Sequence, residues 1–427
     1  FGSEEARLSI RGSGIQRTVH LRGIQLMQDG VPINQADGGG DFQVVEPLAA
    51  RYIEVFRGAN ALQYGSSTLG GAVNFVTPTG FDAPGVQARA ELGSFGYARL
   101  QASAAGATGP LDYFVSASHF YQDGFRTHAE QDNNRLFGNV GFRINPALET
   151  RFYLASVDSD SELPGSLTKA QVKQDPSQVN LNTTPPGNDV ISKNNKRDLR
   201  VHRLANKTTW QDADTRVDAS AFVVRKNLFH PIFQVIDQYN LDYGADLRAS
   251  QRFAGGHRAT LGVTVHRNET MDDRFNNVGG KPGARTNKLD QTVNSATVYG
   301  EAQFRLDPRW AAVAGAQAMR TTRAQTDLFI AGPAGDESRS KTYLGFSPKL
   351  GFVFDQTPAV QFFGNVSRSF EPPSFAELTN TPNPGFVFSD AQTATTLELG
   401  TRGRHGEVEW DVAVYRGQVQ NELLTLN

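Results

Sequence analysis

The chain has 427 residues, with 42 Lys and Arg against 44 Asp and Glu, so its formal charge is −2 at pH 7. Proteins that bind nucleic acid normally show a basic excess, and we therefore exclude nucleic acid as a partner. Cysteine is absent, which excludes disulfide scaffolds and thiolate metal sites. The 42 glycines and 28 phenylalanines indicate a β-rich chain with many turns.

Residues 1–80 consist of short β-like runs separated by glycine clusters. We predict a small mixed α/β domain of tight turns, with one helix near residues 47–51. Pro78 and Gly80 close this domain, and residues 81–85 form a short joint to the rest of the chain.

Residues 86–427 contain about fifteen segments of 10 to 16 residues in which apolar and polar side chains alternate. Such segments are typical of strands with one apolar and one polar face. In residues 297–305 the apolar face carries Val298, Gly300, Ala302 and Phe304. In residues 408–417 it carries Trp410, Val412 and Val414. These segments exceed the usual strand length of globular sheets and suit tilted membrane strands.

The connections between these segments alternate between tight turns and long polar loops. The long connections lie at about 122–134, 158–197, 228–240, 269–291, 323–341 and 370–393. Regular alternation of short and long connections is typical of an antiparallel up-and-down transmembrane β-barrel. The alternative is a large soluble β protein such as a propeller, but no signature repeats at the 40 to 50 residue blade period.

Five motifs follow one another within the first 80 residues. They are Ile10-Arg11-Gly12, Asp29-Gly30-Val31-Pro32, Glu54-Val55-Phe56-Arg57-Gly58, Tyr64-Gly65 and Gly70-Gly71-Ala72-Val73-Asn74-Phe75. In these motifs the chain resembles the TonB-dependent outer-membrane transporters, and FEPPS at 370–374 and LELG at 397–400 extend the resemblance to the far end. On softer grounds, such as ELPGSLTKAQ at 162–171, it resembles the ferric-dicitrate and siderophore receptor branch.

The resemblance implies an all-β dominated fold, with a partial plug domain (1–80) inside a partial barrel (86–427) of the 22-stranded class. A signal peptide, a TonB box and about seven strands would be missing, so we expect an incomplete gene product. The implied location is the outer membrane of a Gram-negative bacterium, in contact with its lipid and lipopolysaccharide. The implied partners are TonB with its inner-membrane energising complex and a small-molecule chelate.

The implied function is active import of a metal chelate, such as a ferric siderophore or ferric citrate. Cobalamin, an organic cofactor or a saccharide would be an alternative cargo. A passive porin-like channel and a soluble β-rich enzyme or binding protein are alternatives of other classes. We expect no permanently bound cofactor, because the iron chelate is cargo.

The resemblance also implies a latch between plug and barrel. In this family two plug arginines pair with two barrel glutamates, and the matching residues are Arg11, Arg57, Glu371 and Glu398. A buried guanidinium needs a carboxylate to offset its desolvation. The alternative for Arg57 is that it bonds carbonyl groups within the plug.

We expect substrate contacts from the outward apex of the plug and from the inner face of the barrel. The plug candidates are Gln16, Arg17, Gln35, Asp37, Phe42 and Gln43, and the barrel candidates are Arg151, Arg225 and Arg368. Cations and amides suit a carboxylate- or catecholate-bearing iron chelate. For each residue, the alternative is an ordinary solvated side chain.

No motif of an enzyme is present: there is no G-x-S-x-G, no H-E-x-x-H, no P-loop and no Rossmann fingerprint. We therefore predict that the chain is not an enzyme. His119 and His128 flank one loop, and Asp158, Asp160 and Glu162 lie in another, but solvated loop residues explain both groups. We predict no metal-binding residues.

Overall fold

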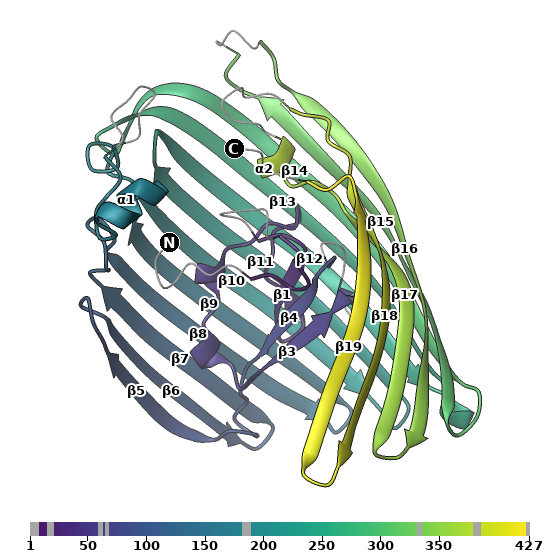
Figure 1. Ribbon diagram of the computed structural model, residues 1–427. Coiled ribbons are helices and arrows are strands. Elements are labelled where there is room, and N and C mark those ends of the chain that lie inside the picture. Colours follow the sequence, from purple (N-terminus) through teal and green to yellow (C-terminus); the bar gives the residue numbers. More distant parts are fainter. Residues whose placement is uncertain are drawn as a thin grey trace.

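The computed structural model describes residues 8–14, 21–58, 63–64, 68–181, 189–330, 335–378 and 386–423. Within these ranges the strands form two sheets, one of four strands in the order β2-β1-β4-β3 and one of fifteen strands running sequentially from β5 to β19. Figure 1 shows the large sheet curving around the small one, which lies on its concave side. The predicted plug within an antiparallel up-and-down barrel wall is therefore confirmed, as is the predicted number of wall strands.

The small sheet is built around a fully buried central strand. Its strands are β1 (Ile24–Gln28), β2 (Val31–Pro32), β3 (Tyr52–Arg57) and β4 (Gly71–Val76). β1 pairs parallel with β4 and antiparallel with β2. The β1–β2 turn is Asp29-Gly30, and both residues have positive φ, the conformation that favours Asp-Gly in two-residue hairpins.

Every strand of the large sheet pairs antiparallel with its neighbour in sequence. The strands are β5 (Gly85–Leu92), β6 (Ala98–Thr108), β7 (Leu111–Gln122), β8 (Gln131–Asn145), β9 (Leu148–Glu162), β10 (Lys196–Gln211), β11 (Thr215–Pro231), β12 (Gln234–Arg252), β13 (Arg258–Val278), β14 (Lys281–Arg305), β15 (Trp310–Asp327), β16 (Arg339–Thr357), β17 (Val360–Glu371), β18 (Gln392–His405) and β19 (Val408–Gln420).

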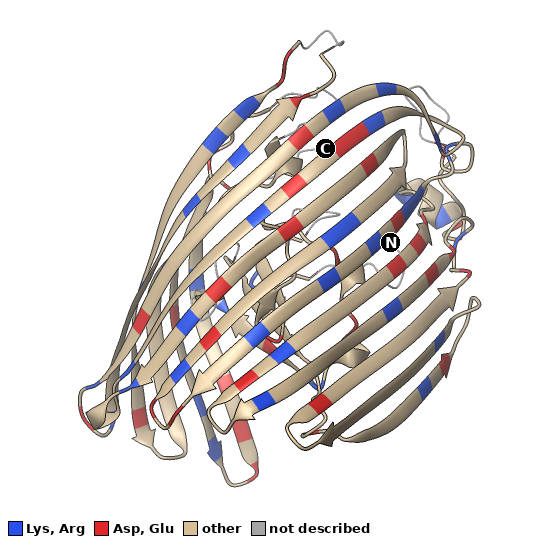
Figure 2. Ribbon diagram, turned by 180° about the vertical axis from the view of Figure 1, so that it is seen from behind, with Lys and Arg blue, Asp and Glu red and all other residues tan. Residues whose placement is uncertain are grey.

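The apolar face of these strands points away from the plug. On β14, Val298 and Phe304 are 58% and 49% exposed, whereas the alternate residues Thr297 and Tyr299 are 5% and 3% exposed. The predicted alternation is therefore correct. An outward apolar and inward polar wall is the arrangement that a lipid-embedded barrel requires. Figure 2 shows Lys and Arg lying beside Asp and Glu across the tilted strands.

Two of the predicted long loops are strands instead. β11 continues to Pro231 and β12 begins at Gln234, while β13 and β14 are joined at Gly279-Gly280. Beyond the membrane both faces of a strand can be polar, so the alternation that marks a strand in the sequence disappears there.

Short helices occur in the loops and in the plug. They are α1 (Lys169–Gln174), α2 (Phe375–Leu378) and the 3-10 turns η1 (Phe42–Val44), η2 (Pro47–Ala49) and η4 (Ala254–Gly256). The helix predicted near residues 47–51 is the single turn η2. None of the described helices is long and apolar enough to cross a bilayer.

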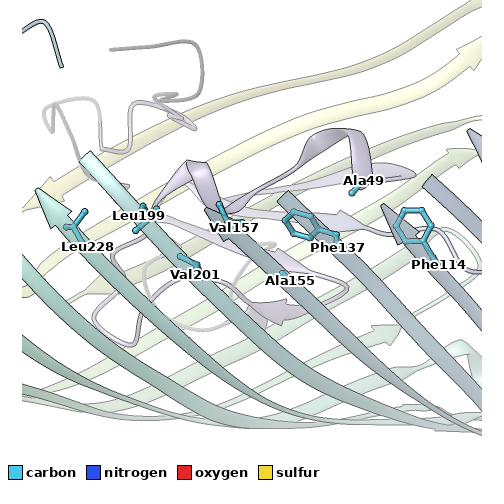
Figure 3. Packing of buried hydrophobic residues seen from close by; sticks show 8 residues of the cluster. All are labelled: Ala49, Phe114, Phe137, Ala155, Val157, Leu199, Val201 and Leu228. Atoms are coloured by element: carbon cyan, nitrogen blue, oxygen red, sulfur yellow. The ribbon is translucent and has the colours of Figure 1, made fainter. Parts of the chain in front are cut away.

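The plug packs on the inner wall through a continuous apolar cluster, shown in Figure 3. Ala49 of the plug belongs to the same cluster as inward side chains of β7 to β11. Those side chains are Phe114, Phe137, Ala155, Val157, Leu199, Val201 and Leu228. Because this contact removes apolar surface from water, it favours the docked position of the plug.

Candidate functional site

Arg11 of the plug forms an ion pair with Glu398 on β18. Its Nη1 lies 3.3 Å from Oε2 of Glu398, and its Nη2 contacts Oε1. The side chains are only 11% and 5% exposed, and the Arg11 guanidinium also lies 4.4 Å from the centre of the Tyr415 ring. The structure thus brings together one of the two predicted pairs.

Arg22 makes the second buried link between plug and barrel. Its Nη1 donates to Oε2 of Glu377 at 2.8 Å, and its Nε lies 3.3 Å from Oε1 of Glu371. Glu371 also accepts the Gly23 backbone N–H at 2.8 Å and the Gln392 amide at 2.5 Å. The sequence prediction missed Arg22, although Leu21-Arg22-Gly23 repeats the pattern of Ile10-Arg11-Gly12.

The prediction that Arg57 pairs with a buried barrel glutamate is wrong. Arg57 is 53% exposed, and its Nη2 lies 3.9 Å from Oδ2 of Asp411, which is equally exposed. It ends β3, the edge strand of the small sheet, where a side chain can stay in contact with water. Since its guanidinium is not desolvated, it does not need a buried carboxylate. Glu371 is paired by Arg22 instead.

A third link centres on Asp41 in the plug apex. Its Oδ1 contacts Nη2 of Arg197 on β10, and its Oδ2 accepts from Nζ of Lys226 on β11 at 3.0 Å. Burial alone would raise the pKa of Asp41, but Lys226 and Arg197 outweigh it and hold the pKa below its usual range. Asp41 is therefore a fixed negative charge between two barrel cations.

A fourth link joins Glu46 to the inner face of β7 and β8. Ser118 donates to Oε2 of Glu46 at 2.7 Å, and Nη1 of Arg135 lies 3.8 Å from the same oxygen. Both charged side chains are 1% exposed. Nε of Arg135 donates to the Gln43 carbonyl at 3.1 Å, so this cation contacts both η1 and the residue that precedes η2.

Three of the plug residues predicted to contact substrate, Gln35, Asp37 and Gln43, bond to residues of the barrel instead. Gln35 bonds Lys226 and Asn240, each at 2.8 Å. Asp37 accepts the Phe375 N–H at 3.2 Å, and Gln43 accepts from Arg197 at 3.1 Å. Phe42 packs against the apolar cluster around β1. Gln16 and Arg17 lie outside the described residues.

Arg151 faces the lumen as predicted, but it is buried in an ion pair near the short-turn rim. Its Nη1 and Nη2 each lie 2.8 Å from an oxygen of Asp112, and Nη1 donates to Asn139 at 2.6 Å. Asp112 also accepts the Gly80 backbone N–H at 3.0 Å. Arg151 therefore anchors the end of the plug to the wall and is not open to a ligand.

The lumen-facing positions predicted for Arg225 and Arg368 are wrong. On β11 the inward residues are Phe222 and Lys226, both buried, whereas Arg225 is exposed on the opposite face. On β17 the inward residue Glu371 is buried and Arg368 is exposed. Alternation along a strand shows which residues share a face, but it cannot show which face points to the lumen when both faces carry polar residues. The contacts with the plug identify the lumen-facing side.

Asp29 is a buried carboxyl at the opposite end of the plug from Asp41. It accepts from the backbone N–H and hydroxyl of Thr77 at 3.0 and 2.8 Å. Burial raises the pKa of Asp29 to about 6, and the Thr77 hydrogen bonds together with Lys207 and Arg203 oppose this only in part. Its neutral and ionised forms are thus close in free energy near neutral pH.

Among the described residues, no group of three or more His, Asp or Glu side chains could hold a metal ion. Of the loop candidates, Asp158 pairs with Arg200 at 3.1 Å, and His128 lies 3.3 Å from Glu162. The first contact is an exposed ion pair between β9 and β10, and the second joins the 9% exposed His128 side chain to the end of β9.

The family described as "TonB dependent receptor-like, beta-barrel" matches residues 87–427, and "TonB-dependent Receptor Plug Domain" matches residues 1–72. The chain belongs to the TonB-dependent receptors. Members of this family are transporters of the Gram-negative outer membrane and not enzymes, which places the chain in that membrane.

Several characterised proteins are similar over nearly the whole chain. The vitamin B12 transporter BtuB of Vibrio vulnificus is 23% identical over 435 residues, covering 96% of this chain and 62% of that protein. The unliganded ferric citrate transporter FecA has a TM-score of 0.78 at 17% identity, covering 97% and 63% of the two chains. The ferric yersiniabactin receptor FyuA of Yersinia pestis has a TM-score of 0.75 at 13% identity, covering 94% and 64%. The chain thus spans about three-fifths of these relatives' length.

Proposed function

We propose that the protein imports a metal chelate, a ferric siderophore or ferric citrate, by a TonB-dependent mechanism. One observation carries the proposal: the plug lies on the concave side of the barrel wall and is held there by buried ion pairs such as Arg11–Glu398. A solute cannot diffuse freely past a plug held in this way. Transport therefore requires that the plug be rearranged, and TonB with its energising complex would supply that force.

The plug apex offers a physical route from ligand binding to loosening of the plug. The amide oxygens of Gln35 and Gln43 accept hydrogen bonds from Lys226 and Arg197 of the barrel wall, respectively. A carboxylate- or catecholate-bearing chelate that bound either cation would compete with those contacts. Ligand binding would then weaken the link that Asp41 makes to the same two cations.

Ferric chelates are supported as cargo by several proteins of the same fold. FecA is named as a ferric citrate transporter and Fiu as a ferric-catecholate import receptor. The alternative cargo is cobalamin, favoured by the similarity to the vitamin B12 transporter across 96% of this chain.

The test is uptake by a deletion strain that carries the full-length gene on a plasmid, in TonB-positive and TonB-negative backgrounds. We expect radiolabelled iron to enter with one or more chelates from a panel of citrate, catecholates and hydroxamates, and only when TonB is present. Calorimetry on the purified full-length protein should identify the same chelate.

Uptake that persists without TonB would refute the mechanism, as would open-pore conductance of the wild-type protein in planar bilayers. Binding of cyanocobalamin with no binding of any ferric chelate would reject the iron cargo and leave the transport mechanism intact. The two parts of the proposal can therefore fail separately.

A further inference from the structure

Four cations follow one another along the inward face of β10 and β11, beneath the plug. They are Arg197, Arg203 and Lys207 on β10 and Lys226 on β11, which pairs across the sheet with Val201. Successive members are therefore roughly 13, 7 and 13 Å apart along the strand direction. From first to last the height is roughly 23–27 Å at a tilt of about 35–45°, which matches the ~25 Å apolar band of an outer-membrane barrel. We call this set the cation row.

Arg203, in the middle of the cation row, is buried against neutral groups. It is 5% exposed, and it lines a closed cavity of about 30 Å³ between plug and wall. Its Nη1 donates to Oε1 of Gln28 at 3.0 Å, and its Nη2 donates to the Val31 and Pro32 carbonyls at 3.2 and 3.4 Å. Among the described residues it has no carboxylate at ion-pair distance, and its Nε has no acceptor. A neutral amide donor would hold the same carbonyls without the cost of burying a charge.

The two ends of the cation row also have their acceptors on the plug. Arg197 and Lys226 both contact the carboxylate of Asp41. At the opposite end of the plug, Lys207 donates from Nζ to the Asp29 carbonyl at 3.0 Å. Displacement of the plug from β10 and β11 would therefore remove all of these acceptors and leave four cations facing the lumen.

The carboxylates of the neighbouring wall have other partners. Besides the cation row, the inward charges of β10 and β11 are Arg216 and Asp218, which pair with each other at 2.8 Å. On β12, Asp242 and Asp246 accept hydrogen bonds from side chains of β13 at 2.8 and 2.6 Å. The inner surface of β10 and β11 thus carries a positive excess that only the docked plug covers.

We propose that the cation row is a track for an anionic chelate, and that the passage through the lumen opens along β10 and β11 when the plug is displaced. Several fixed charges in succession attract an ion into a passage and let it leave each site for the next. Charge on Arg203 and Lys207, away from the plug apex, is explained by this second state of the lumen. The proposal rests on the proposed import function and narrows its cargo to chelates of net negative charge.

The first test measures the electrostatic potential at the cation row without any cargo. The chain contains no cysteine, so one can be placed at Ala205, between Arg203 and Lys207, and in a control protein at Thr297 on the inward face of β14. In full-length protein otherwise free of cysteine, urea opens the plug in planar bilayers. Anionic and cationic methanethiosulfonates of similar size then modify the cysteine, and the change in conductance gives each rate.

The ratio of anionic to cationic modification rates should be at least about fivefold higher for Ala205→Cys than for Thr297→Cys. Adding Lys207→Gln to Ala205→Cys should remove most of this difference, and Lys207→Arg should preserve it. Equal ratios at the two positions would overturn the proposal.

The second test measures transport by cells with functional TonB. Lys207→Gln and its matched control Arg248→Gln each remove an inward cation that donates to one plug carbonyl, Asp29 at 3.0 Å and Gln63 at 3.3 Å. The probes are radiolabelled ferric dicitrate, an anionic ferric tris-catecholate and a cationic ferric hydroxamate. Calorimetry on the purified variants gives the affinity for the probe that is imported, and the urea midpoint of plug opening checks that both variants are folded.

Lys207→Gln should lower the maximal uptake rate of an anionic chelate at least about threefold with its Kd unchanged, while Arg248→Gln should keep the wild-type rate. Lys207→Arg should restore the rate. An unchanged rate in Lys207→Gln would overturn the proposal, as would import of the cationic hydroxamate alone. If the wild-type protein imported none of the chelates, the proposed function would fail instead, and the cysteine test would still decide whether the cation row attracts anions.

Discussion

Removal of the Glu398 charge should lower the stability of the docked plug more than removal of one charge from an exposed ion pair. In the variant Glu398→Gln the shape of the side chain is kept, but the Arg11 guanidinium, only 11% exposed, loses its carboxylate partner. Breaking a buried pair from one side costs about 3–5 kcal/mol. We expect the lower end, about 3 kcal/mol, because Arg11 keeps its contact with the Tyr415 ring.

The assay is urea-induced opening of the barrel, followed as ion conductance in planar bilayers. For a plug of this size the free energy of unfolding falls by about 1 kcal/mol per molar urea. The opening midpoint of Glu398→Gln should therefore shift down by about 3 M. The double variant Arg11→Met/Glu398→Gln should recover much of the loss, because it also removes the unpaired buried guanidinium that accounts for most of the cost of breaking the pair from one side.

Arg51→Gln is the matched control. Arg51 pairs with Asp82 at 2.7 Å, but the two side chains are 47% and 35% exposed, and exposed pairs contribute about 0–1 kcal/mol. A midpoint for Glu398→Gln no lower than that of Arg51→Gln would refute the reasoning. So would a double variant whose loss equals the sum of the two single losses.

Three further predictions use the same opening assay or a folding assay. Because the pKa of Asp29 is raised from 3.8 to about 6, the stability that its protonated form contributes should be fully present below about pH 4 and lost as pH rises through 6, a loss of about 3 kcal/mol, and Asp29→Asn should abolish this part of the pH dependence. Because the pKa of Asp41 is lowered, its contribution should be complete above about pH 4 and decline below it, and in Asp41→Asn the midpoint at pH 7 should fall while this acid-dependent decline disappears. In Gly80→Ala the added methyl carbon would lie 1.8 Å from the Gly106 carbonyl oxygen, so the yield of heat-modifiable folded protein should fall well below that of Gly417→Ala, where the nearest atom, the Thr396 hydroxyl oxygen, would lie at 3.7 Å. Normal folding of Gly80→Ala, or an unchanged pH profile in either aspartate variant, would contradict the corresponding prediction.

The sequence was sufficient for the architecture, because each strand carries its own signal. Alternation such as Val298 to Phe304 follows from the pleat of one strand, and a lipid-facing strand must show it wherever it lies in the wall. The same signal failed beyond the membrane, where β11 to β14 extend as strands without an apolar face.

The latch was predicted only in part. The motif containing Arg11 and the one containing Glu398 correctly named one pair, since each motif fixes a local backbone position. Arg57 and Arg22 stand in equally plausible Arg-Gly motifs, and only their places in the folded plug decide which side chain is desolvated beside Glu371.

The sequence by itself determined the strand count, the plug and the family, because these depend on periodicity and on motifs within short segments. Only the tertiary structure decided which face of each strand meets the plug. For that reason Arg225 and Arg368, which the sequence placed in the lumen, lie on the outer surface. Gln35 and Gln43, predicted to contact substrate, instead join the plug to the wall. The environment of such a residue depends on partners that lie far away in the sequence. A local sequence pattern does not show which distant residues fold next to it.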